Sequence, residues 1–129
     1  MLNIPCPCNP KIQYLNCCRK LHIDNYAIGN PEQIMRSRYS AFVFGLKQYL
    51  LDTWHISTRP KQNEFILEKN IKWLGLEVKF YKLIDEKNSV VNFVARSKIQ
   101  GKAHRLEEHS TFILEKGRWY YVDGKFKIN

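Results

Sequence analysis

The sequence predicts an α+β domain in which helices cover one face of a curved antiparallel sheet, behind a small cysteine-rich knuckle at the N-terminus. Three observations lead to this prediction. Apolar residues recur with a helical period over residues 31–52, and from Lys72 onward they alternate with polar residues as in strands. All four cysteines lie between positions 6 and 18.

Size and composition exclude several classes of protein. With 129 residues, 44% of them hydrophobic, the chain can bury a core without disulfide bonds. Its apolar runs are only a few residues long, too short for a membrane-spanning helix. The first residues lack both the charged and the apolar region of a secretory signal, so we expect a cytoplasmic protein with reduced thiols and no membrane partner. The net charge of +9 is dispersed along the chain, which is typical of a solvated surface.

The cysteines are the sharpest signal in the sequence. Cys6, Cys8, Cys17 and Cys18 have the spacing C-x-C-x8-C-C. Four thiolates so close together suit one tetrahedral zinc ion, and four protein ligands leave no open position for catalysis. Residues 1–20 hold few large apolar side chains, so a structural Zn²⁺ would supply the folding energy that this segment lacks.

Other interpretations of the cysteines remain open at this stage. Disulfide bonds would need an oxidising compartment, which the N-terminus does not indicate. Cys17 and Cys18 could form a redox pair, although such a pair does not need two further cysteines. His22, four residues beyond Cys18, is a further candidate ligand, and the alternative is a histidine on the surface.

A long helix is predicted after the knuckle. Asn30 suits the N-cap, Pro31 the first helical position, and Gln33 completes a capping-box pattern. The helical period then predicts one helix over residues 31–52, with Gly45 inside it. A loop over residues 53–60 and a second, shorter helix over residues 60–69 follow.

Four strands are predicted in the second half of the chain, at residues 72–81, 90–99, 104–115 and 118–122. Turns separate them, and Asp123-Gly124 is expected to turn the chain again. In the second strand, Val91, Phe93 and Ala95 alternate with polar residues. In the first strand, one face is expected to hold Leu74, Leu76, Val78 and Phe80, and the other Trp73, Glu77, Lys79 and Tyr81.

Glu108 is the oddity of the third strand. Alternation places it on the covered face, among apolar neighbours, where a carboxylate needs a partner or a raised pKa. We favour a structural ion pair that closes the sheet over the helix, and the alternative is a group that transfers protons. A register error of one residue would turn it outward. The candidate partners are His55, Arg59, Arg36 and Arg38.

These motifs resemble a known family. The cysteine pattern resembles the SEC-C zinc motif, and the rest of the chain resembles the YchJ family of bacterial proteins. The segments that carry the resemblance are residues 35–42, 49–50, 53–55, 73–76, 93–96, 108–112 and 117–124. It implies a SEC-C zinc knuckle over residues 1–22 and a nuclear transport factor 2-like domain over residues 23–129, a cystatin-like cone of curved sheet wrapped around helices.

The sequence departs from the family pattern in two places. Asn9 stands where a glycine commonly follows the second cysteine, and asparagine also tolerates a left-handed turn. Many members carry a second SEC-C motif at the C-terminus, and this sequence stops at Asn129 without one. Functions that depend on two zinc knuckles are therefore in doubt for this chain.

Three functions compete on this basis, and we favour a role that is not enzymatic. SEC-C motifs elsewhere contact proteins and ribosomes, so the resemblance implies a zinc-binding adaptor with a protein or ribosomal partner. The second is a small-ligand binder or an enzyme using the interior of the cone. The third is nucleic-acid binding through the basic surface. A homodimer through Trp73 and Tyr81 on the outer sheet face is also expected. For the second function, Glu108 and His55 would exchange protons, Arg38 or Arg59 would clamp an anion, and Trp54 and Trp119 would form walls.

Overall fold

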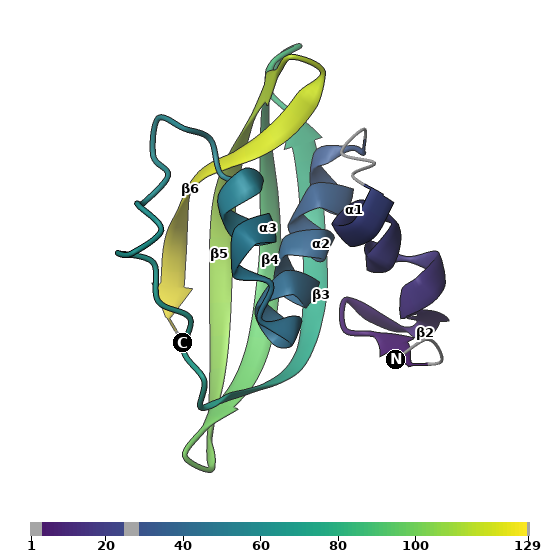
Figure 1. Cartoon of the computed structure of the whole chain (residues 1–129), viewed down its shortest axis with the longest axis vertical. Coiled ribbons are helices and arrows are strands. Elements are labelled where there is room, and N and C mark those ends of the chain that lie inside the picture. Colours follow the sequence, from purple (N-terminus) through teal and green to yellow (C-terminus); the bar gives the residue numbers. More distant parts are fainter. Residues whose placement is uncertain (1–3, 25–28, 129) are drawn as a thin grey trace.

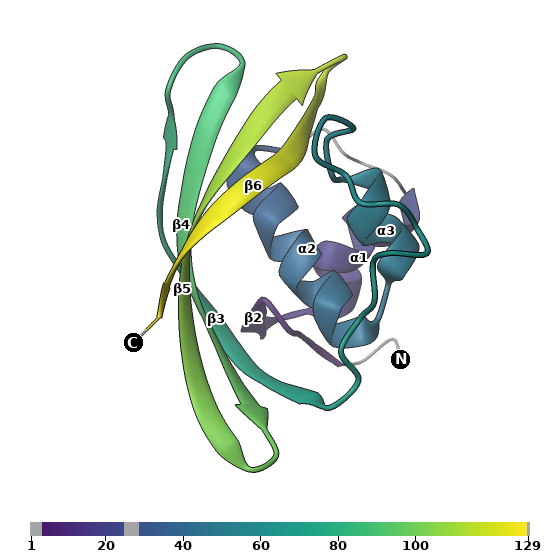
Figure 2. The same ribbon diagram turned by 90° about the vertical axis from the view of Figure 1, so that its left-hand side faces the viewer.

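The computed structural model describes residues 4–24 and 29–128. Four long strands form an antiparallel meander in the order β3-β4-β5-β6, and a separate two-stranded sheet pairs β1 with β2. The helices pack against one face of the curved sheet (Figures 1 and 2), which confirms the predicted α+β architecture. The elements are β1 (Pro5–Cys6), β2 (Asn9–Gln13), the 3₁₀ helix η1 (Tyr14–Asn16), α1 (Cys18–Asp24), α2 (Pro31–Phe44), α3 (Lys47–Asp52), β3 (Ile71–Leu83), β4 (Asn88–Ile99), β5 (Lys102–Glu115) and β6 (Arg118–Ile128).

Helix α2 begins as predicted and ends earlier than predicted. The side chain of Asn30 accepts a hydrogen bond from the backbone N–H of Gln33, and the Gln33 side chain accepts one from the Asn30 N–H, so the capping box is confirmed. The prediction of one helix over residues 31–52 is wrong. Gly45 adopts a left-handed conformation, φ 72°, that closes α2 and separates it from α3.

The predicted helix over residues 60–69 is also wrong. The segment is irregular, with a turn at residues 62–64, and Ile66 is exposed. The ring of Phe65 packs edge-on against Trp54, with ring centroids 5.5 Å apart, and also lies near Phe42. Residues 65–67 are consecutive and form no helical stripe, so contacts with other elements decide their conformation.

A register shift at the start of β3 turns Trp73 toward the helices. The pairing of β3 with β4 is irregular between Trp73 and Gly75, so Leu74 is the extra residue of a bulge. The Trp73 ring packs against Tyr39 and Phe42 of α2, with centroids 5.6 and 6.1 Å away, whereas Leu74 is 48% exposed. The predictions that Leu74 faces the core and that Trp73 faces outward are therefore wrong.

A second register shift, between Val78 and Phe80, exchanges the faces of the residues that follow. Phe80 is half exposed and its ring lies near His109 on the side away from the helices. Tyr81 instead pairs with Val91, a buried core residue. Alternation alone assigned Phe80 and Tyr81 to the opposite faces, because it cannot register an inserted residue.

Strand β6 is longer than predicted. It continues through Asp123-Gly124, so the expected turn there is wrong; its pairing with β5 has one register irregularity, at Val122. A Cβ added at Gly124 would lie 2.2 Å from Oε2 of Glu108, so the backbone of β6 makes a close approach to a side chain of β5. Glycine is present at position 124 because nothing larger fits beside this carboxyl group.

A single cluster of buried side chains runs from the N-terminal hairpin through α2 to the sheet. The predicted boundary at residue 22 falls inside α1, and α1 itself packs on α2. Val91, Phe93 and Ala95 of β4 are buried as alternation predicts, and Val94, which alternation does not place with them, is buried too. Within residues 4–24 and 29–128, no helix is long and apolar enough to cross a membrane. The cluster consists of Cys6, Cys8, Tyr14, Cys18, Ile34, Met35, Tyr39, Val91, Phe93, Ala95 and Phe112.

Candidate functional site

Three short elements bring the four cysteines together. Cys6 ends β1 and Cys8 lies in the turn before β2. Cys17 closes the 3₁₀ helix η1, and Cys18 opens α1, so the chain turns between these two neighbours as expected from their adjacency. All four sulfur atoms lie within 4.8 Å of one another.

The distances between the sulfur atoms fit a tetrahedral zinc site. A tetrahedron with Zn–S bonds of about 2.3 Å has S···S edges of about 3.8 Å. The Sγ atom of Cys8 lies 3.7 Å from that of Cys6, 3.6 Å from that of Cys17 and 3.6 Å from that of Cys18, and Cys17 and Cys18 are 4.0 Å apart. None of the four forms a disulfide bond. These residues therefore offer a complete set of soft ligands.

If the four cysteines were ionised, their negative charge would need a compensating cation. Hydrogen bonding to Cys6 and Cys8, together with burial, raises the pKa of the Cys18 thiol. Four thiolates in this space would repel one another strongly unless a metal ion compensated them. Because Cys6, Cys8 and Cys18 are 1–3% exposed, a metal held there would be shielded from solvent.

Helix α2 supplies the second layer around the cysteines. The hydroxyl of Ser40 lies 3.3 Å from Sγ of Cys18 and 3.6 Å from Sγ of Cys6. The guanidinium of Arg36 donates to the backbone carbonyl of Cys8, at 3.1 Å, and pairs with Glu32. A hydroxyl and a positive charge next to thiolates are the partners that orient and stabilise metal ligands.

His22 is not one of the clustered ligands. One ring nitrogen, Nδ1, lies 2.7 Å from the hydroxyl of Tyr14, and the other, Nε2, lies 2.8 Å from the carbonyl oxygen of Ser37. Burial lowers the pKa of this imidazole. The reading of His22 as a surface residue is also wrong, because its ring joins the knuckle to α2 and packs edge-on against Tyr49.

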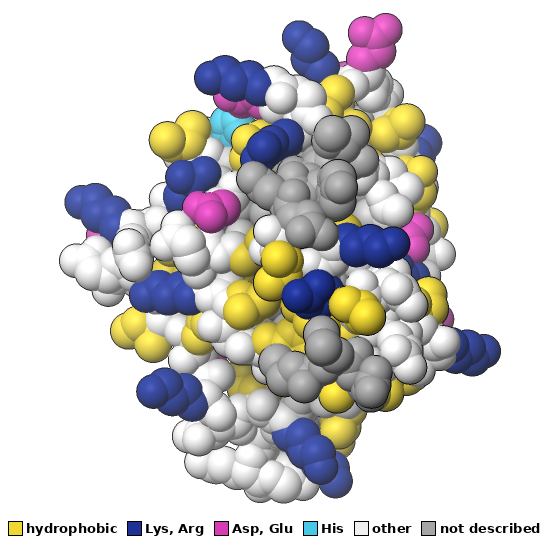
Figure 3. Space-filling view, turned by 45° about the vertical axis from the view of Figure 1, so that its right-hand side comes forward, with side chains coloured by type: hydrophobic (Ala, Val, Ile, Leu, Met, Phe, Trp, Pro, Cys, Tyr) yellow, Lys and Arg dark blue, Asp and Glu magenta, His cyan; other side chains and the backbone are white. Residues whose placement is uncertain are grey.

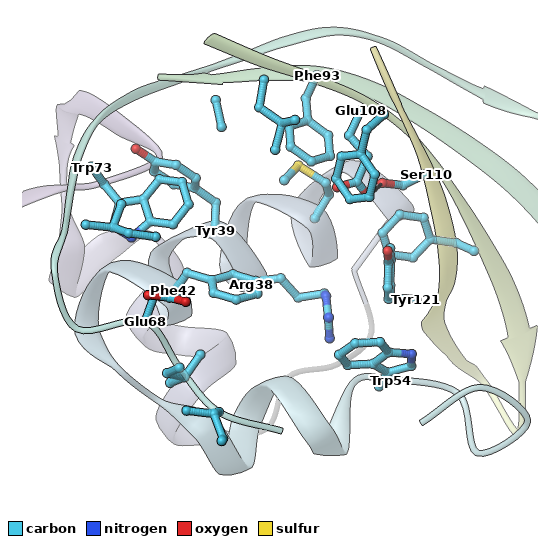
Figure 4. A pocket seen from close by; sticks show the side chains of 18 residues that line it. Arg38, Tyr39, Phe42, Trp54, Glu68, Trp73, Phe93, Glu108, Ser110 and Tyr121 are labelled. Carbon is cyan, nitrogen blue, oxygen red and sulfur yellow. Dashed lines mark hydrogen bonds between the residues drawn. The ribbon is translucent and has the colours of Figure 1, made fainter. Parts of the chain in front are cut away.

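A second site lies between α2 and the sheet. A cavity of about 340 Å³ opens there, near the low end of the range for small-molecule pockets. Its walls come from α2, the irregular segment after α3 and all four long strands (Figure 4). The aromatic residues that line it are Tyr39, Phe42, Trp54, Trp73, Phe93, Phe112, Tyr121 and Phe126, and the charged ones are Arg38, Glu68 and Glu108.

Arg38 projects from α2 into this cavity. Its Nη1 donates to the carbonyl oxygen of Leu50 and to the hydroxyl of Thr53, both at 2.7 Å. The guanidinium lies over two aromatic rings, 4.5 Å from the centroid of Tyr121 and 5.2 Å from that of Trp54. Burial lowers the pKa of Arg38 to about 10, so the group stays charged at neutral pH.

Glu108 faces the cavity, as alternation along the third strand predicts. It is 8% exposed, and its carboxylate accepts hydrogen bonds from the hydroxyls of Ser110 and Tyr121. Burial raises its pKa, and these hydrogen bonds and the charge of Arg38 counteract the rise. No ion pair joins Arg38 to Glu108 within the described residues, so the favoured direct ion pair does not form.

The remaining candidate residues lie outside this cavity, apart from Trp54. Nε2 of His55 bonds to Glu115 and Nδ1 lies 2.7 Å from the hydroxyl of Ser57, so the predicted proton-transfer pair with Glu108 does not form. The backbone of Trp54 bridges to β6, which turns Trp54 inward and its neighbour His55 outward. Arg59 donates to the carbonyl oxygen of Trp54. Trp119 packs on the core and lines a different depression.

Of the residues that line the cavity, sequence reasoning had placed only Arg38, Trp54 and Glu108 in a pocket, and Tyr121 and Trp73 are among those that it missed. Tyr121 touches both charged groups, and Trp73 forms the opposite wall. The sequence did contain a signal for Tyr121, because it lies two positions after Trp119 and alternation places the two side chains on the same face of the strand. The signal for Trp73 was hidden by the bulge at Leu74.

The comparisons with known proteins agree with this architecture. The sequence profile described as "YchJ, middle NTF2-like domain" matches residues 30–124. The chain belongs to the YchJ family. A UPF0225 protein of Methylibium petroleiphilum is 47% identical over 124 residues, covering 95% of this chain and 88% of the relative. A UPF0225 protein of Bordetella pertussis is 45% identical over 127 residues, covering 95% and 92%.

Two solved structures have the same fold. The solution structure of a SEC-C motif containing protein from Rhodopseudomonas palustris superposes with a TM-score of 0.81 at 26% identity, covering 95% of this chain and 98% of that one. The crystal structure of a SEC-C motif containing protein from Psychrobacter arcticus gives 0.76 at 25% identity, covering 100% and 85%. The NTF2-like α+β fold with an N-terminal cysteine knuckle is thus shared along nearly the whole chain.

The raised pKa of Glu108 predicts a pH dependence of stability. The folded state binds a proton at Glu108 more tightly than the unfolded chain, so this group contributes stability below its unfolded pKa and loses it as pH rises through the folded pKa. Glu108→Gln removes that loss. Urea unfolding between pH 4 and pH 7 should show the variant gaining stability relative to the natural protein as pH rises. Glu77→Gln, at an exposed position, is the control, and an equal trend in both variants would contradict the prediction.

Proposed function

We propose that this YchJ-family chain is a small-ligand-binding protein whose N-terminal knuckle is held by one structural zinc ion. The observation that carries the proposal is the cavity of about 340 Å³ between α2 and the sheet, with Arg38 and Glu108 buried in its wall without pairing to each other. Buried charges that are not consumed by an internal ion pair are costly, and binding sites are the places where such groups are retained.

The cysteine cluster supports a structural role for the metal. Four sulfur ligands complete a tetrahedron, so no coordination position is left for a substrate. The knuckle also contributes Cys6, Cys8 and Cys18 to the main core cluster. A zinc ion would therefore stabilise the platform on which α2 rests, and the chemistry of ligand recognition would take place on the other side of that helix.

Binding accounts for the cavity better than catalysis does. Glu108 accepts hydrogen bonds from two hydroxyls, and the imidazole of His55 is engaged with Glu115 instead. A general acid or base needs a proton partner within reach. The hydroxyls of Ser110 and Tyr121 stabilise the carboxylate and thus suit recognition.

A second candidate is the adaptor role, which one surface favours. On the knuckle, Ile12 is 41% and Leu15 is 36% exposed; Lys11 directly precedes Ile12, and Arg19 lies four positions after Leu15. Figure 3 shows apolar side chains on this face, with Lys and Arg side chains spread singly among them.

The adaptor role predicts that the double variant Ile12→Asp/Leu15→Asp loses the partner in a pull-down, whereas Ile23→Asp keeps it. Equal recovery with both variants would count against docking through the knuckle. The Lys and Arg side chains of this face form no continuous basic surface, so this face does not favour nucleic-acid binding.

The zinc proposal predicts one zinc ion per chain in protein purified without chelator. Cys18→Ser should lose the metal and more than about 4 kcal/mol of unfolding free energy, a range typical of losing a metal site. Ser40→Ala removes a hydroxyl beside Cys18 without removing a sulfur and should keep the zinc. Elemental analysis and urea unfolding measure both effects. A metal-free natural protein with an ordered knuckle would disprove the proposal.

The ligand-binding proposal predicts that N-phenyl-1-naphthylamine, an uncharged fluorescent dye, binds the folded protein at one site. Ala95 is 4% exposed and lines the cavity, so Ala95→Phe should fill the space and reduce the affinity at least about tenfold. Ala103→Phe, at an exposed position of β5, should leave binding unchanged. Circular dichroism checks folding, and fluorescence titration measures affinity. Absence of saturable binding, or an equal effect of both variants, would refute the cavity as a ligand site.

A further inference from the structure

Most polar side chains of the cavity are committed to protein partners. The Tyr39 hydroxyl bonds to the backbone of Gly75, and Nε1 of Trp54 donates to the hydroxyl of Thr58 at 3.2 Å. Ser110 donates to Glu108. In the part of the chain that the structure describes, Arg38 and Glu108 are the buried charged groups of the wall, and each has hydrogen-bonding capacity beyond its protein partners.

These two groups present complementary hydrogen bonding. Both hydrogen bonds found for the Arg38 guanidinium use Nη1, and a guanidinium has five N–H donors. The ionised carboxylate of Glu108 is an acceptor with lone pairs on two oxygens. Tyr121 lies between them, because its ring is under Arg38 and its hydroxyl bonds to Glu108 (Figure 4). The cavity wall therefore offers a donor and an acceptor, one on each side of Tyr121.

The charges of the cavity select against ions. Arg38 and Glu108 cancel each other, and the further charged residue in the wall is Glu68, which is exposed. An anionic ligand would meet Glu108 in a place where desolvation already disfavours negative charge. A cationic ligand would meet the buried guanidinium of Arg38. An uncharged group with both an acceptor and a donor satisfies the two residues together.

The remaining walls select the body of the ligand. Trp73 lies edge-on to Tyr39 with centroids 5.6 Å apart, and Phe42, Phe93 and Phe112 complete an aromatic lining. Such rings pack well against a flat aromatic molecule. The volume of about 340 Å³ suits a compact ligand of a few fused rings.

We propose that the cavity binds an uncharged, flat heteroaromatic molecule with a cyclic amide edge, whose carbonyl oxygen accepts from Arg38 and whose N–H donates to Glu108. This inference rests on the proposed function and specifies the ligand class of the same cavity. Nucleobases and other fused-ring lactams belong to this chemical class. The N–H donor would add a further hydrogen bond to the buried carboxylate, beside those from Ser110 and Tyr121.

The experiment uses displacement of N-phenyl-1-naphthylamine from the full chain by three bicyclic probes of similar size. The probes are 2-quinolone, which has the amide edge, N-methyl-2-quinolone, in which the donor is blocked, and 2-naphthoate, which is an anion. 2-Quinolone should compete at least about tenfold more strongly than the other two, because a hydrogen bond to a charged group contributes about 1.5–3 kcal/mol. Equal competition by all three, or strongest competition by 2-naphthoate, would overturn the inference while leaving ligand binding intact.

Matched variants locate the recognition. Glu108→Met keeps the side-chain length, and Arg38→Met keeps an unbranched apolar stem without the guanidinium; each should remove the preference for 2-quinolone over its N-methyl derivative. Glu115→Gln lies on the same strand outside the cavity and should retain the preference. A preference that survives both methionine variants would place the amide edge elsewhere and refute the assignment. If a variant does not fold, the comparison of probes on the natural protein still decides. If the dye itself does not bind, the proposed function is refuted. If the dye binds but the probes compete equally, only the inference about the ligand class is refuted.

Discussion

The packing of the cysteine knuckle against helix α2 is the contact on which the rest of the structure depends. The knuckle is poor in apolar side chains, and three of its cysteines are nevertheless buried in the same cluster as the sheet residues. Ser40 and Arg36 of α2 reach the cysteines and their backbone, and His22 spans from Tyr14 to the carbonyl of Ser37. A metal held by the sulfurs would therefore stabilise the position of α2 as well as the knuckle.

One face of helix α2 contacts the cysteine knuckle, and the other lines the cavity. Residues Arg36, Ser37 and Ser40 face the knuckle, whereas Arg38 and other α2 residues line the cavity on the sheet side. Helical spacing makes this division possible, because residues three or four apart share a face and intermediate ones do not. The ligand site proposed for this chain is thus built on a helix whose opposite face contacts the cysteine cluster.

Two buried charged side chains, Arg38 and Glu108, distinguish the cavity from an apolar one. Arg38 is held by two acceptors and two aromatic rings, and Glu108 by two hydroxyls and the close backbone at Gly124. The two groups neutralise the cavity without contacting each other. An apolar pair of side chains would fill this space at lower cost, so the retained charges are best explained by what they bind.

The sequence by itself determined the cysteine cluster, the capping box of α2, the order of the four long strands, and the inward face of Glu108. Each of these follows from local spacing, which sets backbone period and brings near neighbours together. Only the tertiary structure decided the outward turn of His55, the inward turn of Trp73 and the irregular course of residues 60–69. A bulge changes the parity of every residue beyond it, and a loop takes its shape from the surface it covers. Both depend on residues distant in the chain, so no local pattern records them.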